Sequence, residues 1–307
     1  MARAVEAAAL DAGSPGLAGA AQLIAVLEGS WGYRDPGRLL AERFGATART
    51  VVAEVGVLQE DVIADVCSTI ARGELDVAVV VGGEARYREL RAKVAGVEVS
   101  ETSQADGVAP DRRLSSHSLG IHDLELTRNL VTPAVAYALV ESARAAADQL
   151  DAVTLRSRLG SRYERFAQVA AGNPNAWDRL PHRAAEIVEP SPSNRMIASP
   201  YTKLLCSQWN VDQAAALILC STEAADRFGI AADRRVFPWG SAVSNHAVPV
   251  VQRADLARTP GAELAALRLR DALAIGADDL DHVDLYSCFP AAVDTFAQAW
   301  GLGTIER

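Results

Sequence analysis

The first third of the chain alternates short apolar runs with amphipathic segments, and this alternation limits the fold more than any other feature. The apolar runs lie at 22–27, 49–56 and 75–83. Between them, apolar residues at helical spacing, followed by a glycine, predict helices at 35–45 and 58–73. Strands that alternate with helices favour a mainly parallel sheet that is covered on both faces.

The alternation stops at residue 84 and returns near residue 212. Residues 84–130 are polar and show no steady period, as is typical of an insertion or a functional segment. Beyond them, periodicity predicts helices at 133–150, 152–172, 222–229, 261–276 and 290–302 and strands at 212–221, 234–239 and 282–287. We therefore expect two βα-rich halves, each with its own sheet, around an inserted polar and helical region.

The composition narrows the range of partners and compartments. The net charge is −9, so the protein repels phosphate backbones and nucleic acid is not an expected partner. No apolar run is long enough to predict a membrane span. The four cysteines show no close pairing and no CxxC, which argues against a disulfide framework and against a metal site. We expect a cytoplasmic protein.

Four segments carry a resemblance to a known family, and they come in the family's order. They are "IARGELDVAVVVGGEA", "NPNAW", "SPYTKLLCSQWNVDQAAALIL" and "DLYSCFPAAV". Together they resemble the thiolase superfamily. Within it, the chain is most similar to the sterol-carrier-type thiolases and to actinobacterial thiolase-like acetyl-CoA acetyltransferases.

The resemblance implies an α/β fold of two related βαβ-rich halves in a layered sandwich, with a loop domain inserted in the first half. We expect 1–83 and 130–198 to form the N-terminal half. Residues 84–130 would begin the inserted loop domain, whose furthest expected end is residue 198. Residues 199–307 would form the C-terminal half. Its C-terminal part is expected to be missing, because the family's Gly-His-Pro and Cys-x-Gly motifs are not found.

The family's nucleophile is the first point of difference. Thiolases place a cysteine at the start of the helix before the Gly-Gly strand, where the helix dipole favours the thiolate. Here the matching position is Gly56 or Val57, and neither side chain can attack a thioester. Cys67 lies several turns into the same helix, and we interpret it as a core residue. Gly56 and Val57 are expected to line the thioester cleft.

The sequence "YSCF" stands where the family has its Asn-Glu-Ala-Phe or His-Asp-Cys-Phe box, and we call residues 286–289 the YSCF box. The resemblance implies catalytic roles for Tyr286 and Cys288, with Ser287 beside the thioester. A tyrosine can donate a hydrogen bond to an oxyanion, or act as a general acid or base. The alternative is that Tyr286 is a polar residue at a strand end and that Cys288 packs against Phe289.

Three functions follow from these residues. The first is a thiolase-like protein acting on acyl-CoA thioesters in lipid or steroid degradation, nominally an acyltransferase without the usual cysteine. The second is a retro-aldol carbon–carbon lyase of the steroid side-chain aldolase type that uses Tyr286. The third is a non-catalytic acyl-CoA-binding subunit.

The resemblance also implies how the protein meets its substrate and partners. Arg86, Arg88 and Arg91 would contact the CoA phosphates, although exposed charges on a helix face explain them nearly as well. No cofactor is expected beyond the CoA thioester as substrate. We expect a homodimer, with 49–56 as the edge strand that pairs across it. The aldolase alternative implies a small OB-fold acyl-CoA-binding partner.

Overall fold

The computed structural model describes residues 1–100, 102–116, 120–245 and 247–303, and its contacts divide the chain into two compact units. Unit 1 combines Met1–Leu119 with Gln208–Ser241, and unit 2 combines Gly120–Ser207 with Ala242–Arg307. Each unit therefore consists of two separate parts of the chain. The chain does not pass from one unit to the other at the expected boundary after residue 198. The assignment of thiolase-like halves stays a prediction.

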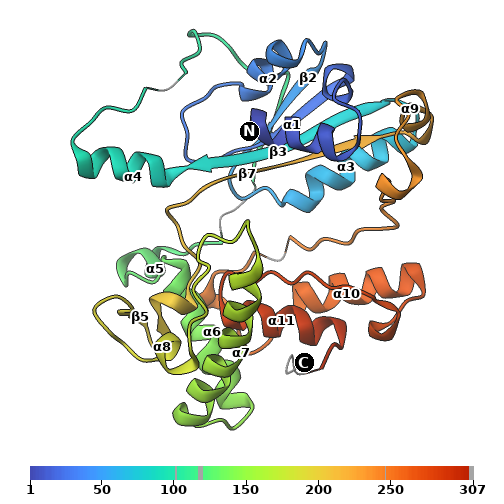
Figure 1. The fold of residues 1–307 in the computed structure, drawn as a ribbon. Coiled ribbons are helices and arrows are strands. Elements are labelled where there is room, and N and C mark those ends of the chain that lie inside the picture. The colour runs from blue at the N-terminus through green and yellow to red at the C-terminus, as the bar shows by residue number, and fades with distance from the viewer. Residues whose placement is uncertain (101, 117–119, 246, 304–307) are drawn as a thin grey trace. The chain divides into compact units, whose positions relative to one another are not determined.

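A five-stranded sheet lies at the centre of unit 1 (Figure 1), with the strand order β4-β2-β1-β3-β7. Its strands are β1 (Leu23–Leu27), β2 (Arg49–Ala53), β3 (Val77–Ala85), β4 (Arg112–Leu114) and β7 (Asp212–Cys220). The pairs β1–β2, β1–β3 and β2–β4 are parallel, whereas β7 is antiparallel to β3 along its whole length. The predicted α/β class with a mainly parallel sheet is confirmed.

Helices cover the two faces of this sheet, and the strand period of two decides which residue meets which helix. Val79 and Val81 of β3 lie in a core cluster with α1 (Ala2–Asp11) and α2 (Pro36–Phe44). Ala78 and Val80 point the other way, into a cluster with α3 (Gln59–Ala71). The continuous apolar run of β3 thus supplies both layers (Figure 1).

The predicted limits of α2 are confirmed by its caps. Asp35 is fully buried, and its carboxylate accepts a hydrogen bond from the backbone N–H of Arg38 over 3.0 Å. Pro36 occupies the first turn, where the missing N–H has no partner to lose. Gly45 ends the helix with φ at +68°, a left-handed conformation that glycine adopts without strain. Unit 1 also contains α4 (Arg86–Ala95) and α9 (Thr222–Arg227).

Unit 2 is mainly helical and has its own core. Its helices are α5 (Asp123–Thr127), α6 (Pro133–Ala147), α7 (Ala152–Gly172), α8 (Ala184–Val188), α10 (Pro260–Leu273) and α11 (Pro290–Trp300). A short antiparallel pair joins β5 (Met196–Ala198) to β6 (Tyr201–Thr202). The core gathers buried side chains from both chain segments of the unit, including Leu159, Tyr201 and Phe289. The predicted helices at 133–150, 152–172, 261–276 and 290–302 are confirmed.

Two predicted strands are wrong. Within the described residues, 234–239 and 282–287 form no strand, and the second half has no large sheet of its own. The side chains of Val236 and Val283 are 93% and 46% exposed. These two segments therefore have no neighbouring strand that would hydrogen-bond to their backbone groups.

The predicted dimer edge at 49–56 is also wrong for the described chain. β2 lies between β1 and β4, so its backbone groups are already paired on both sides over part of its length. The strand at 212–221 does form, but it joins the first sheet beside β3 instead of opening a second sheet. β7 therefore forms one edge of the described sheet, and β4 forms the other edge.

Candidate functional site

The YSCF box lies in unit 2, immediately before α11. Tyr286 and Ser287 are exposed, Cys288 is half-buried and Phe289 is buried, so the chain passes from surface to core within the box. Phe289 is the N-cap of α11, and Pro290 is its first residue. The backbone carbonyl of Cys288 accepts a hydrogen bond from the N–H of Ser207 over 2.9 Å, which fixes the box to the chain after β6.

The Tyr286 phenol lies at the surface, with its ring supported from one side. The residue is 58% exposed, and its ring meets Phe296 of α11 edge-on, with 6.3 Å between the ring centroids. Partial burial and a side-chain hydrogen bond to Cys288 raise the pKa of Tyr286 to about 12. The phenol therefore stays protonated at neutral pH and offers a proton to an incoming oxygen.

The pKa of Cys288 is influenced by Tyr286 and by a second phenol that the sequence did not indicate. Tyr286 and Tyr137, which comes from α6, both act to lower the pKa of the Cys288 thiol. Burial raises the pKa of Cys288, although both phenols counteract this shift. Burial and the neighbouring Cys288 also raise the pKa of Tyr137. Cys288 is thus a neutral thiol at neutral pH, which is unfavourable for a nucleophile.

Phe289 stacks with two tyrosine rings. The centroid of its ring lies 4.6 Å from that of Tyr137 and 5.8 Å from that of Tyr201, with interplanar angles of 22° and 21°. Stacked aromatic rings at these separations stabilise a defined arrangement, in addition to the effect of the area they bury. The last residue of the box is therefore in contact with a ring from α6 and with a ring from β6.

The start of α11 is held by a buried polar chain. The backbone N–H of Ala291 donates to the Tyr201 hydroxyl over 3.3 Å, and this hydroxyl donates to the carboxylate of Glu141 over 2.8 Å. Glu141 lies one helical turn after Tyr137 on α6, so a single face of α6 supports both Phe289 and Tyr201. Burial raises the pKa of Glu141, while the hydrogen bond from Tyr201 lowers it.

Sequence reasoning missed Tyr137, Tyr201 and Glu141. Their spacing offered a weak signal, since two polar side chains stand four residues apart on the apolar helix at 133–150. Tyr201 lay inside the quoted segment "SPYTK" without an assigned role.

The turn at Gly56 and Val57 lies in unit 1, between β2 and α3. Gly56 has φ at +99°, and the N–H of Val57 donates to the carbonyl of Glu54 over 3.0 Å. This positive φ explains why glycine occupies position 56, because residues with a side chain rarely adopt it. Cys67 is the ninth residue of α3, away from the start of the helix, and burial raises the pKa of its thiol. The role of Gly56 and Val57 beside a thioester stays a prediction.

The three arginines predicted to contact CoA lie on α4 of unit 1. The guanidinium of Arg86 lies 4.5 Å from the centroid of the Trp209 ring, a cation–π contact. The Arg88 side chain donates to the carbonyl of Ser100 over 2.8 Å, and its backbone N–H donates to Asp212. Arg91 is exposed. Arg86 and Arg88 are therefore engaged within unit 1, and the CoA contact stays a prediction.

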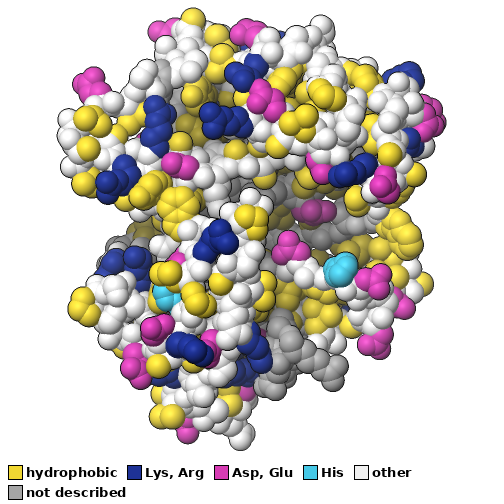
Figure 2. All heavy atoms as spheres, in the orientation of Figure 1, with side chains coloured by type: hydrophobic (Ala, Val, Ile, Leu, Met, Phe, Trp, Pro, Cys, Tyr) yellow, Lys and Arg dark blue, Asp and Glu magenta, His cyan; other side chains and the backbone are white. Residues whose placement is uncertain are grey.

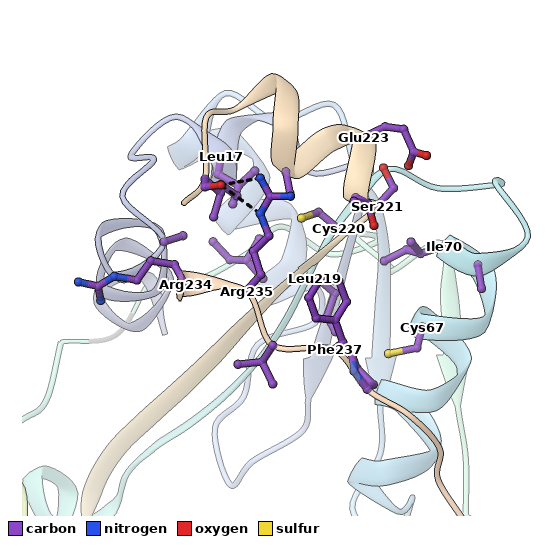
Figure 3. A pocket seen from close by; sticks show the side chains of 18 residues that line it. Leu17, Cys67, Ile70, Leu219, Cys220, Ser221, Glu223, Arg234, Arg235 and Phe237 are labelled. Carbon is purple, nitrogen blue, oxygen red and sulfur yellow. Dashed lines mark hydrogen bonds between the residues drawn. The ribbon is translucent and has the colours of Figure 1, made fainter. Parts of the chain in front are cut away.

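Unit 1 also has a cavity of about 410 Å³ between α3, the end of β7 and the segment before residue 239 (Figure 3). Its wall is mainly apolar, and the thiols of Cys67 and Cys220 lie along it. Arg235 points across it but donates to the carbonyl of Ile230 over 2.6 Å and pairs with Asp226 over 2.7 Å. Arg235 is thus already paired within the unit.

Three further observations bear on ligands and partners. Among the described residues, no group of three or more His, Cys, Asp or Glu side chains is placed to hold a metal ion. In the same part of the chain, no helix is long and apolar enough to cross a membrane. On the face drawn in Figure 2, Lys and Arg side chains are interspersed with Asp and Glu side chains.

Comparisons with known proteins identify the fold. No protein-family model and no curated protein matches the chain. Among solved structures, it matches a monomeric SCP2-thiolase-like protein type 1 from Mycobacterium smegmatis with a TM-score of 0.78 and 27% identity. This match covers 99% of this chain and 59% of that one. It also matches the Ltp2-ChsH2(DUF35) aldolase, with a TM-score of 0.67, 19% identity, and 98% and 71% of the two chains covered.

Both structures share the fold of this chain over nearly its whole length. The chain spans less than two thirds of the first structure's length and somewhat more of the second's. The chain therefore has the thiolase-like fold, and its resemblance to the thiolase superfamily, on the sterol-carrier-type side, is confirmed.

Proposed function

We propose that this protein acts on a β-hydroxyacyl-CoA thioester and cleaves its Cα–Cβ bond by a retro-aldol reaction, with Tyr286 as the acid. The observation that carries the proposal is the exposed phenol of Tyr286, which stands before α11 and is held protonated by partial burial and by Cys288. A protonated phenol donates to a developing oxyanion without first losing a proton.

The reaction divides between an acid and a base. A base takes the proton of the β-hydroxyl, whose oxygen becomes a carbonyl as the Cα–Cβ bond breaks. The bonding electrons pass to the α-carbon and the thioester oxygen as an enolate, and a proton on the α-carbon completes the shortened acyl-CoA. The raised pKa of Tyr286 suits the acid role, which is to stabilise the enolate and supply that proton. The base is a separate group.

Acyl transfer is less well supported because it needs a nucleophile. The start of α3 offers a turn glycine and a valine, while Cys67 and Cys288 are thiols whose pKa is raised by burial. A raised pKa reduces the thiolate that would attack a thioester. Retro-aldol cleavage needs no acyl-enzyme, so it is compatible with these residues.

A partner subunit belongs to the same proposal. One of the matching structures is an aldolase in which Ltp2 is combined with ChsH2(DUF35). We propose that this protein likewise works with a small acyl-CoA-binding partner of the OB-fold type, and that it forms a homodimer.

The proposal is tested by turnover of a synthetic β-hydroxyacyl-CoA, with and without a DUF35-type partner, and with the shortened acyl-CoA and the released carbonyl compound measured together. Tyr286→Phe removes one hydroxyl and keeps the contact with Phe296. We expect kcat to fall about 10²–10⁴-fold, with a much smaller change in KM, because the hydroxyl acts in the transition state. Equal turnover by the variant would end the proposal. An acyl-enzyme detected by mass spectrometry would favour acyl transfer over retro-aldol cleavage.

A further inference from the structure

The sheet of unit 1 ends in two edge strands that differ in length and charge. β4 has three residues, and two of them are Arg112 and Arg113. β7 has nine residues, and Asp212 is its only charged one. Natural proteins protect an edge strand against further pairing by making it short or by adding charges, a proline or a bulge. β4 has the first two of these protections, whereas β7 has none of them beyond Asp212.

Among the described residues, the outer side of β7 has no neighbouring strand. β7 pairs with β3 without interruption from Asp212 to Cys220, and it is the outermost strand of the sheet (Figure 1). In an antiparallel pair, every second residue directs its backbone N–H and C=O groups away from the neighbour. The helices α1 and α3 pack on the two faces of the sheet, so neither provides a strand partner for these groups.

The side chains of β7 leave this edge accessible. Ala214 and Ala215 are exposed, and a single methyl group on each does little to shield the backbone. Leu217 is 49% exposed, although its partner in β3, Val80, is buried. A further strand at this edge would bond the outward backbone groups and remove apolar surface from water at the same time.

A second copy of the same strand fits this edge when it runs antiparallel. Pairing about Ala216 brings all nine residues of each copy into register, and it places Ala215 opposite the partner's Leu217. A small side chain thus faces a large one on both sides of the axis. A parallel pairing would set Asp212 beside the partner's Asp212, and like charges at that distance repel each other.

We propose that the outer edge of β7 is the interface between two copies of this chain, which pair antiparallel about Ala216 and join their sheets into one. This interface rests on the homodimer that is part of the proposed function, but it does not depend on the reaction at Tyr286. It takes the place of the pairing at 49–56, since β2 already has a strand on either side.

The first test measures the oligomeric state of the full chain by sedimentation velocity over a range of concentrations. Leu217→Lys places a charge at the edge. Leu264→Lys is the matched control, because Leu264, on α10 of unit 2, is also 49% exposed. We expect the parent and Leu264→Lys to dimerise alike. Leu217→Lys should weaken the dimer about 100-fold or more, because each dimer loses two buried leucine side chains.

A pair of cysteine variants tests the register. Ala216→Cys puts two sulfur atoms at the two-fold axis, where directly opposite Cβ atoms lie about 4.5–5.5 Å apart. Ala214→Cys changes the same face of the same strand, but its two copies lie four positions out of register, about 14 Å apart. Mild oxidation should give a covalent dimer of Ala216→Cys. It should give none of Ala214→Cys or of the parent, which has four free cysteines.

Each outcome decides the interface. A parent that stays monomeric at every concentration overturns it, and so does a Leu217→Lys variant that dimerises as tightly as the parent. Cross-linking of Ala214→Cys as readily as of Ala216→Cys overturns the antiparallel pairing. If Leu217→Lys loses its thermal transition, the cysteine pair decides.

Turnover separates this interface from the proposed reaction. If Tyr286→Phe turns over as the parent does while the dimer persists, the reaction is wrong and the interface stands. If the chain is a monomer whose turnover depends on Tyr286, the interface alone is overturned.

Discussion

The Tyr201 hydroxyl donates a hydrogen bond to the carboxylate of Glu141 over 2.8 Å, and both side chains are buried in the core of unit 2. Burial is the larger influence on Glu141 and raises its pKa above the usual value. A buried carboxyl that prefers its proton makes the stability of the protein depend on pH.

The first prediction concerns Glu141→Gln. Because the folded pKa is raised, the stabilising contribution of Glu141 is fully present below the ordinary glutamate pKa of about 4.3 and is lost as pH rises through the folded value. Glutamine still accepts from Tyr201 and carries no charge. We expect the variant to be as stable as the parent or more stable near pH 7, with a shallower pH dependence above about pH 4. Urea unfolding across that range measures this, and a clear loss near pH 7 would show that the ionised carboxylate is the stabilising form.

The second prediction concerns Asp294, which pairs with Arg162 over 2.8 Å. The Arg162 side chain is 2% exposed, so losing its partner leaves a buried charge. We expect Asp294→Asn to reduce the free energy of unfolding by about 3–5 kcal/mol. The control is Glu74→Gln, which breaks the exposed pair with Arg72 and should cost less than about 1 kcal/mol. Equal losses in urea titrations would contradict the assignment of Arg162 to the core.

The third prediction compares two glycines of α7. A Cβ on Gly160 would lie 3.2 Å from both the Cβ and the carbonyl oxygen of Ala184, so α8 would have to move. We expect Gly160→Ala to destabilise the protein despite the better helix propensity of alanine, since overpacking costs about 1–3 kcal/mol. Gly172 ends the same helix with nothing within 4 Å of the added carbon. Gly172→Ala should be neutral or mildly stabilising, and a shared sign in thermal melts would reject the packing argument.

The fourth prediction is that Cys67 forms no acyl adduct. The thiol lies on the third turn of α3, and burial and the nearby Glu60 raise its pKa, so little thiolate exists at neutral pH. Incubation with a short acyl-CoA, digestion and mass spectrometry should leave the peptide that contains Cys67 unmodified. An acyl mass on this peptide would restore the covalent mechanism, with Cys67→Ser as the control for the site of attachment.

Local patterns predicted the parts of the fold that depend on near neighbours in sequence. Asp35, Pro36 and Gly45 marked both ends of α2 because caps act within one turn. The apolar run of β3 indicated a strand buried on both faces. The place of β7 was not predictable in this way, because its partner β3 lies more than a hundred residues earlier and an apolar run carries no information about strand direction.

The same limit applied to the candidate site: only residues close together in sequence could be linked. The motif indicated that Tyr286 and Cys288 belong together, since they are two residues apart. It did not indicate Tyr137, because the contact between α6 and the box arises only when two distant segments pack into one core. The error at 282–287 has the same origin: apolar alternation without a paired neighbour gives an extended chain and not a strand.

The pairing of β7 with β3 also sets an order of events during synthesis. β3 is complete at Ala85, but the strand that covers its open side ends at Cys220. Between these points the ribosome adds most of unit 2, while a row of β3 backbone groups has no neighbouring strand. An uncovered apolar edge is a site for mispairing with another nascent chain. The helical segment at 120–207 must therefore emerge while unit 1 is unfinished, and at this stage we expect the protein to depend most on chaperones.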